Sequence, residues 1–309
     1  MSTIITTSEA ATSSPFKRLI VRHQLVTFFV LAFAWSWCGW LPLLLAQNGL
    51  GILPLTFPTD LFVVLAAFAG PTLSAMIVTA IISGKVGVWQ LLRRYVQWRA
   101  GIQWYFLALF GFPIASLLVA SILIGAPLQN ALVHHWPLIF LYYLPQVLVV
   151  LVLGPLWEEP GWRGFALPRL QQKTGALVGS IILGTLWAFW HMPAFFIADT
   201  LVPGRLAFTI PTFLVELLVE LLAGIVLTIV ITWVYNNTRG SLLIAMLVHS
   251  SYDATNHLFH QLVPAFPAGA PLFIATLVCA LLLIAFTKGH LSYRRNRTSV
   301  AEDVSRSTV

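Results

Sequence analysis

Charged residues are scarce in this sequence: they make up 9% of its 309 residues, against about 25% in soluble domains. So few charges cannot cover the surface of a soluble domain, and a soluble globular fold is therefore excluded. Cysteine is nearly absent, and Cys38 and Cys279 both lie inside apolar stretches. Their placement excludes a secreted disulfide framework and a zinc-finger-type site. Residues 1–16 are rich in Ser and Thr and lack the apolar core of a signal peptide, so we expect a retained, disordered tail.

Hydrophobic residues, in contrast, make up 59% of the chain, and its mean hydropathy is +0.88. A helix needs about 20 apolar residues to cross the hydrocarbon core of a bilayer. The apolar windows of that length predict an all-α, polytopic membrane helix bundle with about eight transmembrane helices. The windows are residues 24–47, 60–83, 102–126, 143–166, 176–198, 211–235, 240–260 and 270–287.

Lysine and arginine are distributed unevenly between the connections that join these windows. They recur in every second connection, and only Arg205 lies in a connection of the other set. Because basic connections stay in the cytoplasm, this pattern predicts cytoplasmic N and C termini. We expect a disordered cytoplasmic tail at residues 1–23, one transmembrane domain at 24–287 and a basic cytoplasmic tail at 288–309. The stretch Lys85–Ala100 mixes aromatic residues with three arginines, which is typical of a short helix at the membrane surface.

Acidic residues inside the apolar windows need a specific reason to be there. A carboxylate inside the membrane costs several kcal/mol, so such groups face the protein interior or a wet cavity and mark function. Glu159 and Arg163 are four residues apart with the acid first, which favours an ion pair on one helix face. Glu158 points about 100° away and has no such partner, so it suits a general base that takes a proton from water. The alternative is a buried Glu–Arg clamp without chemistry.

Two histidines and a further carboxylate also lie inside the windows. His191 is in the fifth window, and His249 and Asp253 lie four residues apart in the seventh. An imidazole oriented by a carboxylate occurs both in metal sites and in acid–base sites. The alternatives are a hydrogen-bonded core histidine and a polar seam that joins two helices. At 1.5 Å of rise per residue these histidines and Glu158 lie about 13 to 22 Å deep, so the three clusters can meet near the middle of the membrane.

The three clusters resemble the motifs of the CPBP intramembrane proteases, a family that includes the type II CAAX prenyl endopeptidases and the bacteriocin-processing and immunity (Abi-like) proteins. The family motifs are E-E-x-x-x-R, F-x-x-x-H and H-x-x-x-N or H-x-x-x-D, in this order, and the resemblance covers the core at about residues 145–260. Trp187 replaces the Phe of the second motif, and the third carries Asp where the prenyl-protein branch has Asn. The matching residues are Glu158, Glu159 and Arg163, then His191, then His249 and Asp253.

This resemblance implies an intramembrane endopeptidase that acts on a membrane-associated or lipidated peptide. Glu158 would activate the water, and Glu159 and Arg163 would hold the site. His191, His249 and Asp253 would either bind a metal or polarise the scissile carbonyl. The cofactor is then either none or a divalent metal such as zinc, for which two histidines and a carboxylate leave one open position. Since H-E-x-x-H is absent and the ligands would come from three helices, no spacing supports a metal over direct general-base catalysis, and we favour a metal-free or weakly metal-dependent site. In the metal-free case His249, or Asp253 in its protonated form, stabilises the oxyanion.

Two other functions agree with the same residues. A member of the family without enzymatic activity would keep the motifs for stability and act as an immunity or scaffold protein. A proton-coupled transporter would use Glu158, the histidines and the i,i+4 pair Glu216 and Glu220 as a relay, although no inverted repeat supports it. Glu216 and Glu220 can equally line the same cavity, bind a cation or join two helices. We expect membrane lipids and a peptide or lipidated protein as partners, no nucleic acid, and a prokaryotic plasma membrane as the location.

Overall fold

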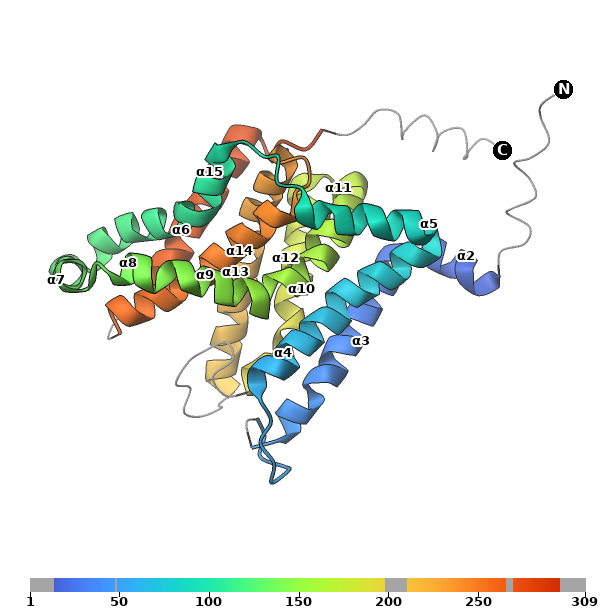
Figure 1. Cartoon of the computed structure of the whole chain (residues 1–309), viewed down its shortest axis with the longest axis horizontal. Helices are drawn as coiled ribbons and strands as arrows, with labels where there is room; N and C mark the ends of the chain where they lie inside the picture. Colours follow the sequence, from blue (N-terminus) through green and yellow to red (C-terminus); the bar gives the residue numbers. More distant parts are fainter. Residues whose placement is uncertain (1–13, 48, 198–209, 265–268, 295–309) are drawn as a thin grey trace.

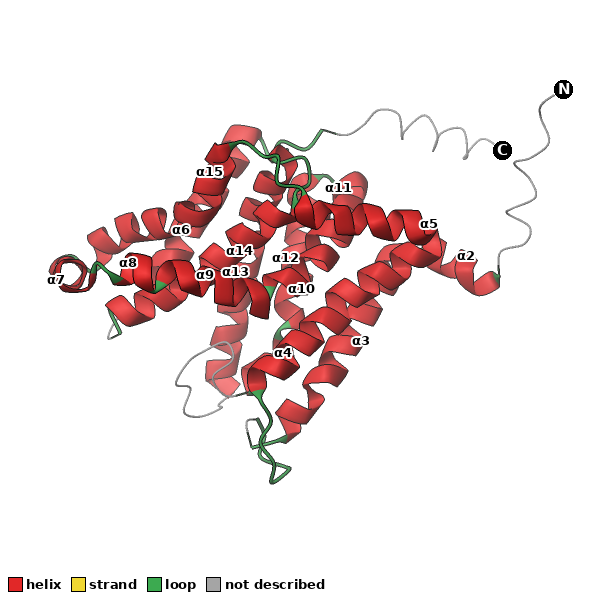
Figure 2. Cartoon of the chain, in the orientation of Figure 1, coloured by secondary structure: helices red, strands yellow, loops and turns green. Residues whose placement is uncertain are grey.

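The computed structural model describes residues 14–47, 49–197, 210–264 and 269–294. Within these ranges the chain forms helices and connecting turns and contains no β-strand (Figure 2). The predicted all-α class is confirmed. The expectations for residues 1–13, for Arg205 and for residues 295–309 lie outside the described residues.

The helices follow one another with short connections. The first half of the chain contains α2 (Pro15–Arg22), α3 (Gln24–Leu45), α4 (Thr59–Ala67), η1 (Phe68–Leu73), α5 (Ser74–Arg93), η2 (Arg94–Val96), α6 (Ile102–Leu123), α7 (Ala126–His135), α8 (Leu138–Leu141) and α9 (Tyr143–Leu153). The second half contains α10 (Pro155–Glu159), η3 (Pro160–Ala166), α11 (Leu167–Thr174), α12 (Ala176–Trp190), η4 (Met192–Phe196), α13 (Ile210–Asn237), α14 (Leu242–Leu262) and α15 (Gly269–Thr287).

Six helical units of the described chain are long and apolar enough to cross a membrane. A seventh is added if α7 and the α8–α9 segment, bent by 72° from each other, count as one span. The protein is therefore a multi-pass membrane protein, but the predicted number of eight spans is not confirmed. The six units are Gln24–Leu45, Thr59–Val96, Ile102–Leu123, Ala176–Phe196, Phe213–Asn237 and Gly269–Thr287.

The difference in number comes from the two windows that carry the polar residues. The window at 240–260 forms α14, but its polar side chains keep it out of the set of apolar spans. The window at 143–166 is divided into α9, α10 and η3. Proline at positions 155 and 160 removes backbone donors there, which ends a helix or changes its winding. The two windows that hold Glu158, Glu159, His249 and Asp253 are thus the ones that do not form continuous apolar spans.

The N-terminal part differs from the expected disordered tail at Pro15–Arg22, which form α2. Ser14 starts this helix by accepting a hydrogen bond from the backbone N–H of Lys17 at 3.2 Å, and Pro15 occupies the first turn. Ile20 is buried where α2 contacts α3 and α5. A cap and one buried apolar side chain are enough to order this short helix against the bundle.

Helix α5 changes direction at Gly84. Its φ of 63° and ψ of −162° are not helical, and only glycine adopts such a conformation readily. The part after Gly84 runs at a steep angle to the part before it (Figure 1). Trp89 and Trp98 are 68% and 62% exposed on the segment that follows. This arrangement agrees with a surface helix in the stretch Lys85–Ala100.

The central helices approach one another closely at glycine residues. A Cβ atom on Gly184 of α12 would lie 2.6 Å from the Cα of Ile225 on α13, and one on Gly161 of η3 would lie 2.5 Å from Pro71 of η1. Small residues allow membrane helices to approach closely where no hydrophobic effect drives them together. Helix α10 consequently lies near the middle of the bundle (Figure 1), in contact with α9, α14 and η1.

Candidate functional site

Two adjacent glutamates lie at the end of α10, where the chain passes into the π-helical segment η3. Pro160 follows them directly, and wider π-helical turns are common at functional sites. Both glutamates are buried, with Glu158 7% exposed and Glu159 0% exposed. Gly161 packs against Pro71, so this segment is held in the interior by a neighbour on η1. Backbone geometry thus places two carboxyl groups side by side within the helix bundle.

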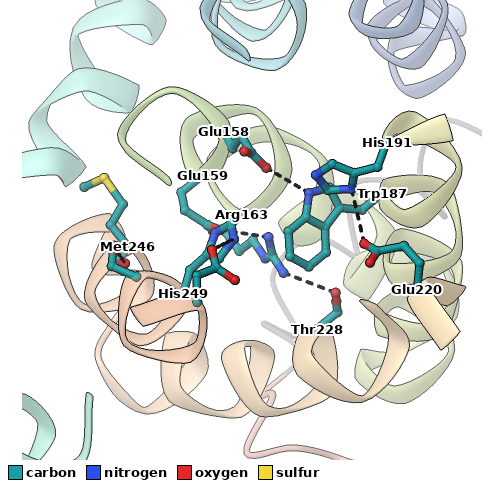
Figure 3. A network of polar contacts seen from close by, with 11 residues as sticks. Glu158, Glu159, Arg163, Trp187, His191, Glu220, Thr228, Met246 and His249 are labelled. Carbon is teal, nitrogen blue, oxygen red and sulfur yellow. Dashed lines mark hydrogen bonds and ion pairs between the residues drawn. The ribbon is translucent and has the colours of Figure 1, made fainter. Parts of the chain in front are cut away.

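Glu159 is the centre of a buried network of charges (Figure 3). Its Oε1 accepts hydrogen bonds from Arg163 Nη1 and from His249 Nδ1, both at 2.8 Å. Arg163 Nη2 also donates to Thr228 Oγ1 at 3.1 Å. The i,i+4 ion pair predicted for Glu159 and Arg163 is present, and it joins α10 and η3 to α13 and α14. Removing one partner of such a buried pair leaves the other charge uncompensated.

Glu158 has a different environment. Its Oε2 accepts a hydrogen bond of 2.9 Å from the indole Nε1 of Trp187 on α12 (Figure 3). Within the described residues it takes part in no ion pair. The prediction that Glu158 has no cationic partner therefore agrees with the structure. Its carboxylate nevertheless has one hydrogen-bond partner, the indole of Trp187. A neutral donor orients the carboxylate and leaves its negative charge unpaired.

Trp187 occupies the middle of the site. The guanidinium of Arg163 lies over its ring at 4.6 Å, and the ring of His249 meets its edge at 4.9 Å. From the sequence, Trp187 in place of the family's Phe is an exchange of one aromatic residue for another. The chemical difference is a signal in the sequence for its role, because only Trp adds an N–H donor to the ring.

His191 faces a carboxylate that the sequence left without a defined role. Its Nδ1 lies 3.4 Å from Oε1 of Glu220 on α13 (Figure 3). Glu220 and Thr228 are eight residues apart, about two helical turns, and so belong to one face of α13. Sequence reasoning singled out Glu220 only through its charge inside an apolar window, and no signal pointed to Thr228. We assign no role to Glu216.

His249 lies between two carboxylates. Glu159 faces its Nδ1 at 2.8 Å, and Oδ2 of Asp253 lies 3.4 Å from its Nε2. The second distance is longer than a hydrogen bond of ordinary strength. The side chain of Asp253 is 39% exposed, whereas that of His249 is 5% exposed. The predicted i,i+4 pair of His249 and Asp253 on α14 is present. The contact at Nε2 of His249 is weaker and more accessible than the contact of Nδ1 with Glu159.

A metal ion would need several ligands that converge on one point. Among the described residues no group of three or more His, Cys, Asp or Glu side chains has an arrangement that could hold a metal. The expected ligands are engaged separately, His191 with Glu220, and His249 with Glu159 and Asp253. The residues present therefore do not fit the three-ligand set of His191, His249 and Asp253.

The segment that carries the glutamate and histidine clusters is similar to known proteins. Residues 140–255 match the family model described as type II CAAX prenyl endopeptidase Rce1-like. A stretch of 54 residues is 39% identical to the protein named CAAX prenyl protease 2 of Methanococcus maripaludis, and it covers 18% of this chain and 20% of that relative. The match thus spans about a fifth of the length of the relative. The resemblance to the CPBP proteases is confirmed over residues 140–255, which include all three motifs.

Proposed function

We propose that this protein is an intramembrane endopeptidase that hydrolyses a peptide bond in a membrane-associated or lipidated substrate. The observation that carries the proposal is the buried carboxylate of Glu158, oriented by Trp187 and unpaired with any cation among the described residues. A structural clamp would need only Glu159 and Arg163, which already form their own ion pair. The additional glutamate beside the clamp is suited to chemistry.

Glu158 acts as the general base in the proposed reaction. It takes a proton from a water molecule while the water oxygen attacks the scissile carbonyl carbon. The carbonyl oxygen gains negative charge. The Nε2–H of His249 stabilises this charge from the more accessible side of the ring, with the imidazole protonated on both nitrogens because its Nδ1–H already donates to Glu159. Protonated Glu158 then gives its proton to the leaving nitrogen as the C–N bond breaks. The products are a carboxylic acid and an amine, and the glutamate returns to its starting state.

The other residues of the cluster position these groups. Glu159 holds Nδ1 of His249, so the opposite ring nitrogen points away from the clamp. Arg163 neutralises Glu159 and is itself tied to Thr228. Glu220 orients His191, which stands beside Trp187 with its ring centroid 5.5 Å away. His191 and Asp253 complete the polar surface that faces the substrate and the water.

The proposal involves no metal ion. In the part of the chain that the structure describes, the carboxylates and histidines do not form a ligand set, and no step of the reaction above needs a Lewis acid. We therefore propose a reaction without a cofactor, and a divalent metal is the alternative that a chelation experiment tests.

Prenylated C-terminal peptides are the first substrate class to test. The matched family model and the relative named CAAX prenyl protease 2 both refer to prenyl substrates. Asp253 stands where the prenyl-protein branch has Asn, so an unmodified or differently lipidated peptide belongs in the same assay. We propose a prokaryotic plasma membrane as the location, with both termini on the cytoplasmic side.

The test is cleavage of a peptide library, with farnesylated C-terminal peptides included, by the full-length protein in proteoliposomes. Wild-type protein is compared with Glu158→Gln and with Asp60→Asn, a matched control that alters an exposed carboxylate on α4. Cleavage by wild type and control but not by Glu158→Gln supports the proposal. Equal cleavage by all three contradicts the role of Glu158. Absence of cleavage in all three favours an immunity or scaffold protein. Solute flux into the same proteoliposomes that follows a pH gradient would favour a transporter.

A further inference from the structure

A hollow lined by four arginines lies outside the candidate active site, where the end of α5 and η2 meet the turn between α13 and α14. Its volume is about 650 Å³. We call it the arginine hollow, and no acidic residue is among the residues that line it. Its lining includes Arg93, Arg94, Arg99, Arg239, Gln97 and Trp98.

Hydrogen bonds hold the wall of the arginine hollow in place. Gln97 donates its side-chain amide to the carbonyl oxygen of Arg239 at 3.1 Å, and Ser241 donates its hydroxyl to the carbonyl oxygen of Gln97 at 2.7 Å. Arg239 has a φ of 57°, in the tight turn that precedes Gly240. These contacts join two segments more than 140 residues apart in the sequence. The hollow is therefore a built feature and not a chance gap between side chains.

The four guanidinium groups are not equally engaged. Arg94 donates to the carbonyl oxygen of Gly164 at 3.2 Å and to the hydroxyl of Tyr235 at 3.0 Å, so it serves the fold. Arg99 lies over the ring of Trp98 at 5.5 Å. Within the described part of the chain, the side chains of Arg93 and Arg239 make no hydrogen bond or ion pair. Two exposed guanidinium groups with no partner among the described residues face a hollow without a carboxylate, and their positive charge and N–H donors are the groups with which arginine binds phosphate.

The apolar rim indicates where the phosphate comes from. Val96 and Trp98 line the hollow and are 69% and 62% exposed, and Trp89 on the same segment is 68% exposed. Exposed tryptophan is typical of the headgroup depth of a bilayer. Basic pockets of membrane proteins on the cytoplasmic side bind the headgroups of anionic lipids. A soluble anion would need the arginines but would gain nothing from this apolar rim.

We propose that the arginine hollow binds the phosphodiester headgroup of one anionic phospholipid, with Arg93 and Arg239 on the phosphate oxygens and Val96 and Trp98 against the glycerol and upper acyl chain. This site is independent of the peptidase proposal, since its residues belong to neither the glutamate cluster nor the histidine clusters. It anchors the segment after Gly84 to one leaflet.

The test is native mass spectrometry of the full-length protein, titrated with dioleoyl-phosphatidylglycerol or dioleoyl-phosphatidylcholine. The double variant Arg93→Gln/Arg239→Gln removes the two free guanidinium groups. Lys173→Gln/Lys288→Gln is the matched control, because it removes the same charge from exposed positions outside the hollow. A further variant, Arg93→Lys/Arg239→Lys, retains the charge. Circular dichroism and gel filtration check that all variants are folded.

We expect wild type to bind one molecule of the anionic lipid in preference to the zwitterionic lipid. The glutamine double variant should bind it about thirtyfold more weakly, while the control changes by less than about twofold. The lysine variant should retain most of the binding. Three results overturn the proposal. The first is equal binding of both lipids, and the second is an equal loss of binding in the control Lys173→Gln/Lys288→Gln. The third is displacement of the lipid by millimolar inorganic phosphate, which would assign the hollow to a free anion.

Discussion

Trp187 and Glu158, which lie 29 residues apart in the sequence, are joined by a hydrogen bond of 2.9 Å from the indole Nε1 to the carboxylate Oε2. The same indole ring lies under the guanidinium of Arg163 and against the edge of His249. One side chain therefore orients the proposed base and packs against the charged clamp. A Phe, as in the family motif, would keep the packing and lose the hydrogen bond.

Replacing Trp187 by Phe should lower kcat by about tenfold or more, because a hydrogen bond to a charged group contributes about 1.5–3 kcal/mol. KM should change little, since the ring still fills its place. Steady-state kinetics with the peptide identified in the library gives both constants. The control is Trp190→Phe, because Trp190 Nε1 is buried and makes no hydrogen bond within the described residues. An equal loss of kcat in both variants would assign the effect to packing.

Glu220 should act on the reaction through His191. We expect Glu220→Ala to lower kcat several-fold, whereas Glu220→Gln should have a smaller effect because its amide oxygen can still face His191 Nδ1 across the 3.4 Å contact. The pH profile of kcat/KM should change shape in both variants, since a purely structural residue would scale the profile without moving it. Identical unshifted profiles would remove Glu220 from the mechanism.

Breaking the buried ion pair should destabilise the protein more than removing it completely. Arg163→Met leaves Glu159 without its cation in the interior, at a cost of about 3–5 kcal/mol. The double variant Glu159→Gln/Arg163→Met should recover part of this loss, because no uncompensated carboxylate remains. Thermal unfolding in detergent compares the two with wild type. A double variant less stable than Arg163→Met would show that Glu159 stabilises the fold mainly through His249.

The close approach of α12 and α13 should be sensitive to a single methyl group. In Gly184→Ala the new Cβ would lie 2.6 Å from the backbone of Ile225, so the helices must separate, at a cost of about 1–3 kcal/mol. This separation also moves His191 away from Glu220, so activity should fall with stability. Gly111→Ala on α6 is the control, because its Cβ would meet only a side chain at 3.7 Å. A neutral Gly184→Ala would mean that the two helices are less tightly held than the structure indicates.

Chelation should leave the proposed activity intact. Peptide cleavage by protein dialysed against EDTA, and then against 1,10-phenanthroline, should keep its rate to within about twofold, since the proposed general-base step does not pass through a metal. Elemental analysis of the purified protein provides an independent readout. Loss of cleavage that zinc restores would replace the metal-free mechanism by a metal-dependent one.

Much of the local structure could be predicted from the sequence. Every predicted apolar window overlaps helical segments of the described chain, because a run of about 20 apolar residues is a local property of the sequence. The Glu159–Arg163 pair and the placing of His249 and Asp253 on one helix face also follow from a spacing of four residues. The number of membrane spans could not be predicted correctly from the apolar windows, because α14 carries a polar stripe and the window at 143–166 is broken by proline.

Long-range contacts, in contrast, depend on how the helices pack against one another. The amino-acid sequence was sufficient to predict the class of protein, the charged residues inside the membrane and their order along the chain. It could not determine that Trp187 donates to Glu158, that Glu220 faces His191, or that His249 meets Glu159 across 90 residues. These contacts depend on how closely α12, α13 and α14 approach α10. That approach is set by small residues such as Gly184 and by π-helical turns, whose effect appears only when the helices are packed against one another.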